Sequence, residues 1–325
     1  MKLTFLGTSS GVPTKTRNVS GLALQKQSSK HWYLIDCGEG TQHQLLHTKL
    51  SLRYLTAIFI THIHGDHCYG LPGLLATTAM SDRSAPLTIV APKGIHEFIN
   101  AVIKTSELYL SYELNFIDVN SLDSSIAFDE FKVSAIELSH RVPSFGYSFT
   151  EVITHRKLDT KLLEKLNIPR GILWGKLQKG ESIELDSGKT ISATDCYLPE
   201  AMSRKIIICG DNDDPSLLKG ESISANLIVH ESTYTQEKAQ KIGSDPQHCS
   251  AKSIAMFAES SKTANLILTH FSARYQEDKN KTPSIFDIES EAKNYYTGRL
   301  FLANDLDMYH LDKIGVVSKT QGGEL

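Results

Sequence analysis

The feature that most restricts how this chain can fold is a cluster of histidines placed directly after a short hydrophobic run. Residues 57–67 read Ala-Ile-Phe-Ile-Thr-His-Ile-His-Gly-Asp-His. Alternate side chains of an extended chain point the same way, so His62 and His64 can reach one metal ion from the end of a strand. The glycine that follows permits a sharp turn, which lets Asp66 and His67 face a second ion beside the first. Imidazole and carboxylate groups are ligands of zinc and its neighbours, so this loop predicts a metal site.

Two ions need more ligands than one loop supplies, and three later strand-like runs each end in a suitable side chain. In α/β folds the ends of several strands gather around one crevice, which is where ligands are usually collected. Each of these residues alone is also common in a core or a loop, but together with the histidine loop they complete a site for two metals. The three further candidates are His140, Asp211 and His270.

Strand-like and helix-like segments alternate along most of the chain, which predicts an α/β fold with sheet layers covered by helices. No repeat or low-complexity tract interrupts this pattern. The runs expected to form strands are 2–5, 32–35, 57–60, 87–90, 114–119, 133–138, 205–209, 227–229 and 266–268. The segments expected to form helices are 39–50, 71–80, 93–105, 236–242, 251–260 and 284–296.

Composition limits the class of protein. With 325 residues, 40% hydrophobic and 22% charged, the chain is not disordered or collagen-like. No apolar run approaches the roughly 18 residues of a membrane helix, and the first residues are too short an apolar stretch for a signal peptide. The five cysteines form no Cys-x-x-Cys pair, which favours a reducing compartment. We therefore expect a soluble, cytoplasmic protein.

Charge is distributed unevenly. The net charge is −3, so any contact with nucleic acid must be local. Residues 151–180, by contrast, carry seven basic and three acidic side chains around a lone tryptophan, Trp174. A charge run of this kind is usually a solvated insertion. It is a candidate phosphate-binding arm if the rest of the chain acts on nucleic acid.

Several motifs together resemble the ribonuclease Z family of the metallo-β-lactamase superfamily. The His-x-His-x-Asp-His loop alone indicates only a metal hydrolase, and the combination with the other motifs is much more specific. Besides the loop at 62–67, the matching stretches are 5–13, 13–18, 36–42, 70–74, 230–233, 247–250 and 303–305. The resemblance covers nearly the whole chain. The segment around 168–177 also resembles the protruding arm of that family, with Gly171-Ile172 where the family often has Gly-Pro.

The resemblance implies an αββα metallo-β-lactamase sandwich, as a single domain over 1–325 with a basic, tRNA-binding arm inserted at 151–188. The implied activity is a zinc-dependent endoribonuclease that cleaves the 3′ trailer from precursor tRNA. It leaves a 3′-hydroxyl on the tRNA and a 5′-phosphate on the trailer. Two Zn²⁺ ions are implied, with Mn²⁺ as a possible substitute. The family also implies a homodimer.

The resemblance assigns roles to individual residues. One ion is held by His62, His64 and His140, the other by Asp66, His67 and His270, and Asp211 bridges the two. Asp66 also accepts a proton, and His248, paired with Glu231, protonates the leaving oxygen. Substrate contacts fall to Lys15, Arg17, Asn18, Arg170 and Lys176. Asp36 is expected to orient a ligand histidine, while His230 either supports the ligands or sits in the core.

Two other functions fit parts of this pattern. The metal loop is equally compatible with a small-molecule phosphodiesterase or arylsulfatase of the same superfamily. The basic arm and the ligands are also compatible with a metal-containing RNA-binding protein without catalytic activity.

Overall fold

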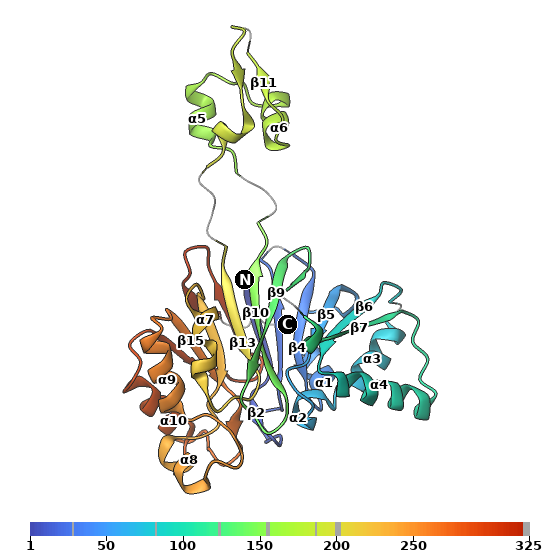
Figure 1. Ribbon diagram of the computed structural model, residues 1–325, viewed down its shortest axis with the longest axis vertical. Helices are drawn as coiled ribbons and strands as arrows, with labels where there is room; N and C mark the ends of the chain where they lie inside the picture. Colours follow the sequence, from blue (N-terminus) through green and yellow to red (C-terminus); the bar gives the residue numbers. More distant parts are fainter. Residues whose placement is uncertain are drawn as a thin grey trace. The chain divides into compact units, whose positions relative to one another are not determined.

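The computed structural model describes residues 1–27, 29–81, 83–122, 125–153, 157–185, 187–198 and 203–320. The chain divides into two compact units. The larger unit consists of Met1–Thr150 and Arg204–Leu325, and the smaller one of Glu151–Ser203 (Figure 1). Among the described residues, no helix is both long and apolar enough to cross a bilayer.

Two sheets form the centre of the larger unit. The first has the strand order β19-β18-β1-β3-β4-β5-β6-β7, and its strands from β4 to β7 run parallel to one another. Their bounds are β19 Val317–Thr320, β18 Met308–Leu311, β1 Lys2–Gly7, β3 Gly21–Gln25, β4 Trp32–Cys37, β5 Leu55–Phe59, β6 Leu87–Ala91 and β7 Leu114–Asp118.

The second sheet has the order β17-β15-β14-β13-β10-β9-β8. Strands β13, β14, β15 and β17 are parallel, whereas β10 runs antiparallel to β13. The bounds are β17 Arg299–Leu302, β15 Asn265–Thr269, β14 Leu227–Glu231, β13 Lys205–Cys209, β10 Ser144–Glu151, β9 Phe131–Leu138 and β8 Ile126–Ala127.

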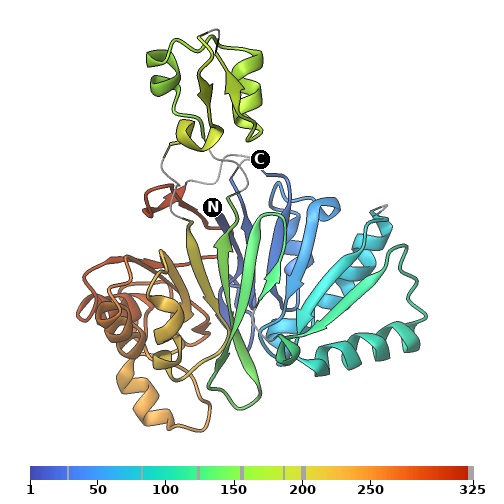
Figure 2. The same cartoon turned by 45° about the horizontal axis from the view of Figure 1, so that its top comes forward.

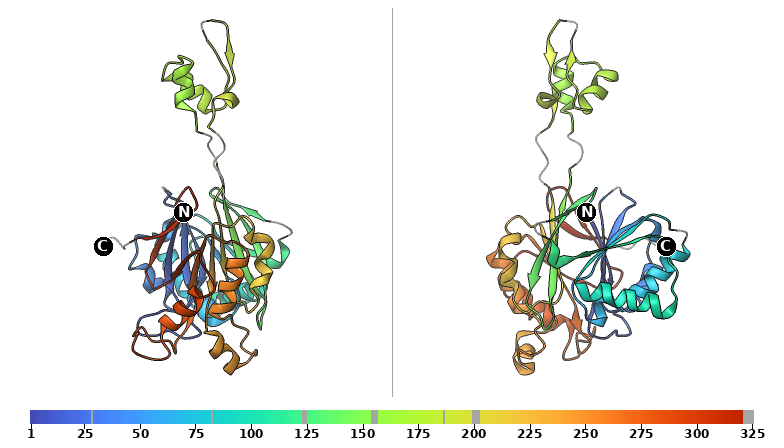
Figure 3. Two further views of the ribbon diagram at one scale, coloured as in Figure 1. Left: turned by 90° about the vertical axis from the view of Figure 1, so that its left-hand side faces the viewer. Right: turned by 45° about the vertical axis from the view of Figure 1, so that its right-hand side comes forward.

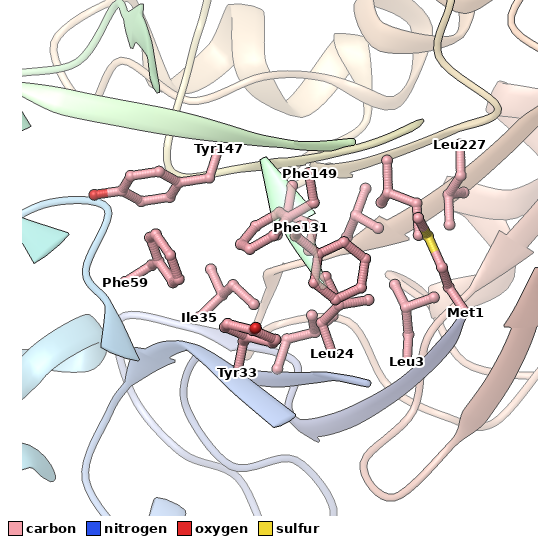
Figure 4. Close-up of a cluster of buried hydrophobic side chains, with 14 of the residues drawn as sticks. Met1, Leu3, Leu24, Tyr33, Ile35, Phe59, Phe131, Tyr147, Phe149 and Leu227 are labelled. Atoms are coloured by element: carbon pink, nitrogen blue, oxygen red, sulfur yellow. The ribbon is translucent and has the colours of Figure 1, made fainter. Parts of the chain in front are cut away.

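The two sheets pack face to face. Their central strands carry apolar side chains on both faces, because one face meets the other sheet and the opposite face meets helices. In β4, Tyr33 and Ile35 point into the core between the sheets, while Trp32 and Leu34 point to the helices on the other face. Figure 4 shows the core between the sheets, where the rings of Phe59 and Phe149 lie 5.1 Å apart in an edge-to-face arrangement. Such contacts add to the burial of the rings themselves.

Helices cover the outer face of each sheet, which completes an αββα sandwich (Figure 2 and Figure 3). On the first sheet these are α1 (Thr41–Leu45), α3 (Leu71–Met80) and α4 (Lys93–Ser106). On the second they are α9 (Ala251–Ser260) and α10 (Ile285–Lys293). The helix predicted over 39–50 is shorter than expected. After Leu45 the backbone continues in turns, in which the N–H and the hydroxyl of Thr48 both donate to the Leu45 carbonyl, at 3.0 and 2.8 Å.

The smaller unit has a core of its own. It contains α5 (Thr160–Lys165), α6 (Ile172–Gln178) and a two-stranded sheet of β11 (Ile183–Glu184) and β12 (Thr190–Ile191). The side chain of Asp159 caps α5 by accepting from the backbone N–H of Leu162 at 3.0 Å. The inserted segment expected at 151–188 lies within this unit, and Arg156, one of its basic residues, is outside the described residues. The fully buried members of the core are Leu163, Ile168, Leu177, Ile183, Ile191, Ala193 and Cys196.

Candidate metal centre

The histidine loop leaves the first sheet at the end of β5 and turns immediately into α2 (Gly65–Cys68). Its entry is held by Tyr147 of the facing sheet, whose hydroxyl donates to the Ile60 carbonyl at 2.7 Å. A Cβ on Gly65 would lie only 2.3 Å from the ring of Tyr69, so a larger residue here would displace that exposed side chain. Strand pairing and this turn therefore fix where the loop points its imidazoles.

One group of four ligand atoms gathers around His64. Its Nδ1 lies 3.1 Å from Nε2 of His62 and 3.2 Å from Nε2 of His140. Oδ2 of Asp211 lies 3.6 Å from the His62 nitrogen and 3.7 Å from the His140 nitrogen. The four atoms all point at one position between them.

A second group has the same form. Nε2 of His67 lies 3.2 Å from Nε2 of His270, and Oδ2 of Asp66 lies 3.5 Å from the first nitrogen and 3.4 Å from the second. The other oxygen of Asp211, Oδ1, completes the group at 3.4 Å from His67 and 3.3 Å from His270. The two oxygens of Asp211 thus face two different positions, one in each group.

These spacings fit metal coordination and do not fit hydrogen bonding. Ligands about 2.05 Å from a tetrahedral zinc ion lie about 3.3 Å from one another, which is close to the separations in both groups. A ring nitrogen carries either one proton or one lone pair, so Nδ1 of His64 cannot hydrogen-bond both of its neighbours. The donor set of imidazoles and carboxylates therefore suits a divalent metal in each group.

Hydrogen bonds on the far side of the imidazoles set their tautomers. Nδ1 of His67 donates to Oδ2 of Asp36 at 2.7 Å, and Nδ1 of His140 donates to the Gln247 carbonyl at 2.9 Å. Nδ1 of His270 lies 3.1 Å from the hydroxyl of Thr233. Each bond leaves a lone pair on Nε2 that faces the ligand group, as a metal ligand requires. Asp36 lies where it was expected to act, next to a ligand histidine.

The charges of the histidines and carboxylates in the two groups also favour bound cations. Burial lowers the pKa of His62 and of His140, which keeps both neutral and able to donate a lone pair. Burial opposes a charge on His67 as well, but the carboxylates of Asp211, Asp66 and Asp36 outweigh it and raise the His67 pKa well above its usual range. Three carboxylates around one ring favour positive charge at this point, which a divalent metal supplies.

A histidine–glutamate pair lies beside both groups. Nδ1 of His248 is 3.1 Å from each oxygen of Glu231, and it is 3.7 Å from Oδ2 of Asp211. Burial alone would lower the His248 pKa, but the adjacent Glu231 carboxylate raises it to about 9. Glu231 is itself held by the hydroxyl of Thr233 and by the backbone N–H of Asn212, at 2.8 Å. The Glu231 carboxylate therefore orients the His248 ring and favours its charged form.

Both ring nitrogens of His230 are engaged by the protein. The residue is fully buried, accepts from the Asn212 amide at 3.0 Å and donates to the Glu231 carbonyl at 2.7 Å. Between the two alternatives for this residue, these contacts favour support of the turn that carries Asp211.

The loop expected to contact substrate, at 13–18, is fixed by hydrogen bonds to distant segments. Lys15 is exposed, and the Asn18 side chain donates to the Glu39 carbonyl at 2.9 Å. Arg17 differs from expectation because its guanidinium is buried and bonded to the protein. Its partners are Glu277, Thr8, Asn304 and the Ala303 carbonyl, each at 2.7 Å. These contacts favour a structural role for Arg17.

Sequence reasoning missed several supporting residues. Gly11 donates its backbone N–H to Oδ2 of Asp66 at 2.8 Å, which places the preceding loop against the ligand. The Asp305 carboxylate accepts from Thr8, from the Asn18 backbone and from Gln44, at 2.6 to 2.8 Å. Asp305 belongs to one of the motifs noted in the sequence, but its partners are about 300 residues away, so no local pattern identifies its role.

In the smaller unit, Arg170 and Lys176 are both exposed. Arg170 forms an ion pair with Glu164 at 2.5 Å, and its guanidinium lies 5.1 Å above the ring of Trp174. The unit is less basic as a whole than its first part. After residue 180 acidic residues outnumber the one lysine, Lys189, so most of the positive charge lies in α5, α6 and their flanks.

Comparison with known proteins identifies the family. A family model described as Anti-Pycsar protein Apyc1 matches residues 1–166. Over the full length, the chain is 47% identical to ribonuclease Z of Pseudomonas putida (strain W619), covering 99% of this chain and 100% of the relative. The chain belongs to the ribonuclease Z family. Ribonuclease Z of Bacillus subtilis (strain 168) is 38% identical over 86% of this chain and 90% of its own.

Solved structures agree with this family and confirm the fold. Human tRNase Z, short form, matches with a TM-score of 0.64 and 27% identity over 95% of this chain and 98% of its own. The metallo-β-lactamase fold protein YhfI from Bacillus subtilis matches with a TM-score of 0.65 at 15% identity, over 94% and 98% of the two chains. The αββα metallo-β-lactamase sandwich expected from the sequence is therefore confirmed.

Proposed function

We propose that this ribonuclease Z family member is a metal-dependent endoribonuclease that removes the 3′ trailer from precursor tRNA. The cut leaves a 3′-hydroxyl on the tRNA and a 5′-phosphate on the trailer. The observation that carries the proposal is the carboxylate of Asp211, whose Oδ2 lies near His62 and His140 and whose Oδ1 lies near His67 and His270, directly beside the His248–Glu231 pair. This arrangement supplies what hydrolysis of a phosphodiester needs: an activated water and a proton donor for the leaving oxygen.

Two zinc ions fit the ligand groups, and Mn²⁺ suits the same ligands. We assign His62, His64 and His140 to one ion, Asp66, His67 and His270 to the other, and Asp211 to both. When bound, such ions activate a water at neutral pH and stabilise the charge that develops on the phosphodiester.

The chain's own residues would then move the protons. Asp66, whose carboxylate accepts from the Gly11 N–H, would accept the proton of the attacking water. His248 would donate its proton to the departing 3′ oxygen, because the Glu231 carboxylate keeps its ring charged and fixes its orientation. Of this pair, His248 is the catalytic residue and Glu231 positions it.

Binding of tRNA is assigned to local positive charge. We propose that Lys15 and Asn18 act near the cut, and that Arg170 and Lys176 contact phosphates of the tRNA body. Phosphate contacts of this kind set position without reading sequence, and RNA helices are recognised mainly by shape. We further propose that the enzyme is a cytoplasmic homodimer. Its five cysteines are all buried and free of disulfides, which fits a reducing compartment.

Analysis of the cleaved ends tests the reaction. A defined precursor tRNA is incubated with the enzyme and Zn²⁺ or Mn²⁺, and the cut position and both new ends are mapped. We expect one cut at the 3′ end of the tRNA body with a 3′-hydroxyl and a 5′-phosphate. A 2′,3′-cyclic phosphate would show attack by the RNA's own 2′-hydroxyl and contradict the mechanism. Hydrolysis of small phosphodiesters without any cleavage of the precursor would favour a small-molecule enzyme.

A further inference from the structure

Glu291 stands out because its carboxylate joins two segments that are far from it in the chain. It lies on α10, next to α9 and to α8 (Gln236–Ile242) (Figure 1). Both of its oxygens accept from the backbone N–H of Gln236 at 2.9 Å, and Oε2 also accepts from the backbone N–H of Lys252 at 3.0 Å. The first residue of α8 and the second residue of α9 are therefore held at one carboxylate.

The segment between these two bonds carries His248. It runs from 236 to 252 and consists of α8, a loop and the start of α9. Its second end is also paired with the residues that follow β14, because the Ala251 N–H donates to the Tyr234 carbonyl at 2.8 Å. His248 lies only four residues before Lys252, so the Glu291 bond holds the chain close to the imidazole.

The loop sets where the His248 ring is mounted. The hydrogen bond to Glu231 fixes one ring nitrogen, at 3.1 Å, but the backbone fixes the place from which the ring extends. The preceding residue, Gln247, has a left-handed backbone conformation with a φ of 49°. A residue other than glycine keeps this conformation only where the surrounding structure holds it. The bonds of Glu291 at the two ends of the segment supply such a restraint.

We infer that Glu291 is a positioning residue for the proton donor. By holding both ends of segment 236–252, it keeps the His248 ring at the place where the 3′ oxygen of the RNA departs. The inference rests on the proposed endonuclease function. Hydrogen bonds to an ionised carboxylate are about twice as strong as those between neutral groups, so loss of this side chain releases the loop. A shift of about 1 Å at a reacting group can reduce the rate about 100-fold.

Two substrates with different leaving groups test this role. The RNA 3′ oxygen needs a proton as it departs, whereas p-nitrophenolate is a stable anion at neutral pH and does not. For Glu291→Ala we expect kcat for precursor tRNA to fall at least about tenfold more than kcat for bis(p-nitrophenyl) phosphate. Glu291→Gln keeps an acceptor oxygen, so it should recover part of the loss, and it replaces the alanine variant in this comparison if that variant does not fold. Equal losses on the two substrates, or no loss on either, would overturn the inference.

Glu259→Ala is the matched control. The Glu259 carboxylate also joins residues that are distant in the chain, because it accepts from the backbone N–H of Thr297 at 2.8 Å and from its hydroxyl at 3.0 Å. It lies at the opposite end of α9 from Lys252, so kcat for both substrates should be unchanged. A loss confined to precursor tRNA in this variant as well would show a general effect of weakening α9, and would overturn the inference.

A double-mutant cycle and hydrogen exchange locate the effect at His248. In the His248→Ala background, Glu291→Ala should reduce kcat for precursor tRNA by less than about twofold, since the group that it positions is already absent. Amide exchange in segment 236–252 should be faster in Glu291→Ala than in Glu259→Ala. Fully additive losses, or equal exchange in the two variants, would overturn the inference. If the unaltered enzyme does not cleave precursor tRNA at all, the proposed function itself is wrong.

Discussion

Removal of the smaller unit gives the sharpest test of how this enzyme selects tRNA. Strands β10 and β13 are antiparallel, with Thr150 opposite Lys205, so the chain leaves and re-enters the second sheet at neighbouring positions. Residues 152–203 can therefore be replaced by a two-residue Asn-Gly turn, which is the preferred connection of such a hairpin. This replacement keeps the pairing register of β10 and β13, so the strands that carry the candidate ligands are unchanged. We expect the variant to fold, bind metal and hydrolyse bis(p-nitrophenyl) phosphate within about twofold of the intact enzyme.

The expected loss on precursor tRNA follows from the charges of the removed unit. Six exposed basic residues lie in its basic part: Lys157, Lys161, Lys165, Arg170, Lys176 and Lys179. If half of them contact phosphates, the slope of log affinity against log salt changes by about 0.9 for each, or about 2.7 in total. Between 50 and 200 mM salt the advantage of the intact enzyme over the variant should then shrink about fortyfold.

The assay measures kcat/KM on both substrates across this range of salt. A matched control changes charge without removing the unit: Glu181→Gln and Glu184→Gln lie outside the basic part and should not weaken tRNA cleavage. Equal salt slopes for the intact and hairpin enzymes would refute the reasoning, as would equal losses on tRNA and on the small diester. In either case the basic residues would not be the source of tRNA selection.

Three further predictions concern the metal centre and the fold. Asp211→Ala should lose both ions, because each oxygen of Asp211 faces a different ligand group. His140→Ala should lose only one ion. Elemental analysis measures the metal content of both variants, and equal loss would contradict a bridging role for Asp211. Thr233→Val removes a hydroxyl that fixes a ligand imidazole, so chelator competition should show metal affinity reduced about 10- to 100-fold, with Thr233→Ser largely restored. Gly7→Ala would place a Cβ 1.7 Å from a backbone oxygen of the neighbouring segment and should reduce the free energy of unfolding by about 2–4 kcal/mol. Gly220→Ala is the control, because the space around Gly220 is open, and it should leave the free energy of unfolding unchanged or raise it by up to about 1 kcal/mol. Denaturant unfolding of both variants would show whether backbone crowding causes the loss of stability in Gly7→Ala.

The candidate ligands could be grouped from the sequence because their positions follow from strand geometry. The histidine loop directly follows β5, and Asp211 and His270 follow β13 and β15, which run parallel in one sheet. Parallel strands end at the same edge of a sheet, so residues that follow them lie close together even when they are far apart in the chain. This proximity can be predicted without knowledge of the side-chain contacts. The central strands were likewise evident from their continuous apolar runs.

The antiparallel parts of the fold and the supporting residues were less accessible. Strands β3 and β10 were not predicted, because glycine, serine and glutamine interrupt their apolar patterns and their place depends on pairing with distant strands. The pairing of His248 with Glu231 came from the family resemblance alone, since a separation of 17 positions in the chain gives no geometric reason for contact.

Arg17 shows that the type of a residue and its position in a motif do not determine its role. A basic residue in a loop beside a phosphodiester site is reasonably expected to bind phosphate, yet its guanidinium instead joins segments 260 to 287 residues away. The same network connects Thr8 to Asp305, which also holds the Asn18 backbone, so the loop is fixed before substrate arrives. A loop already ordered in the free enzyme loses little conformational entropy when it binds RNA. The same segment also meets the candidate ligands directly, because Gly11 donates to Asp66 and because Ser9 and Ser10 pair with Phe271 and Ser272 next to His270, so ordering of the loop and of the ligands is coupled.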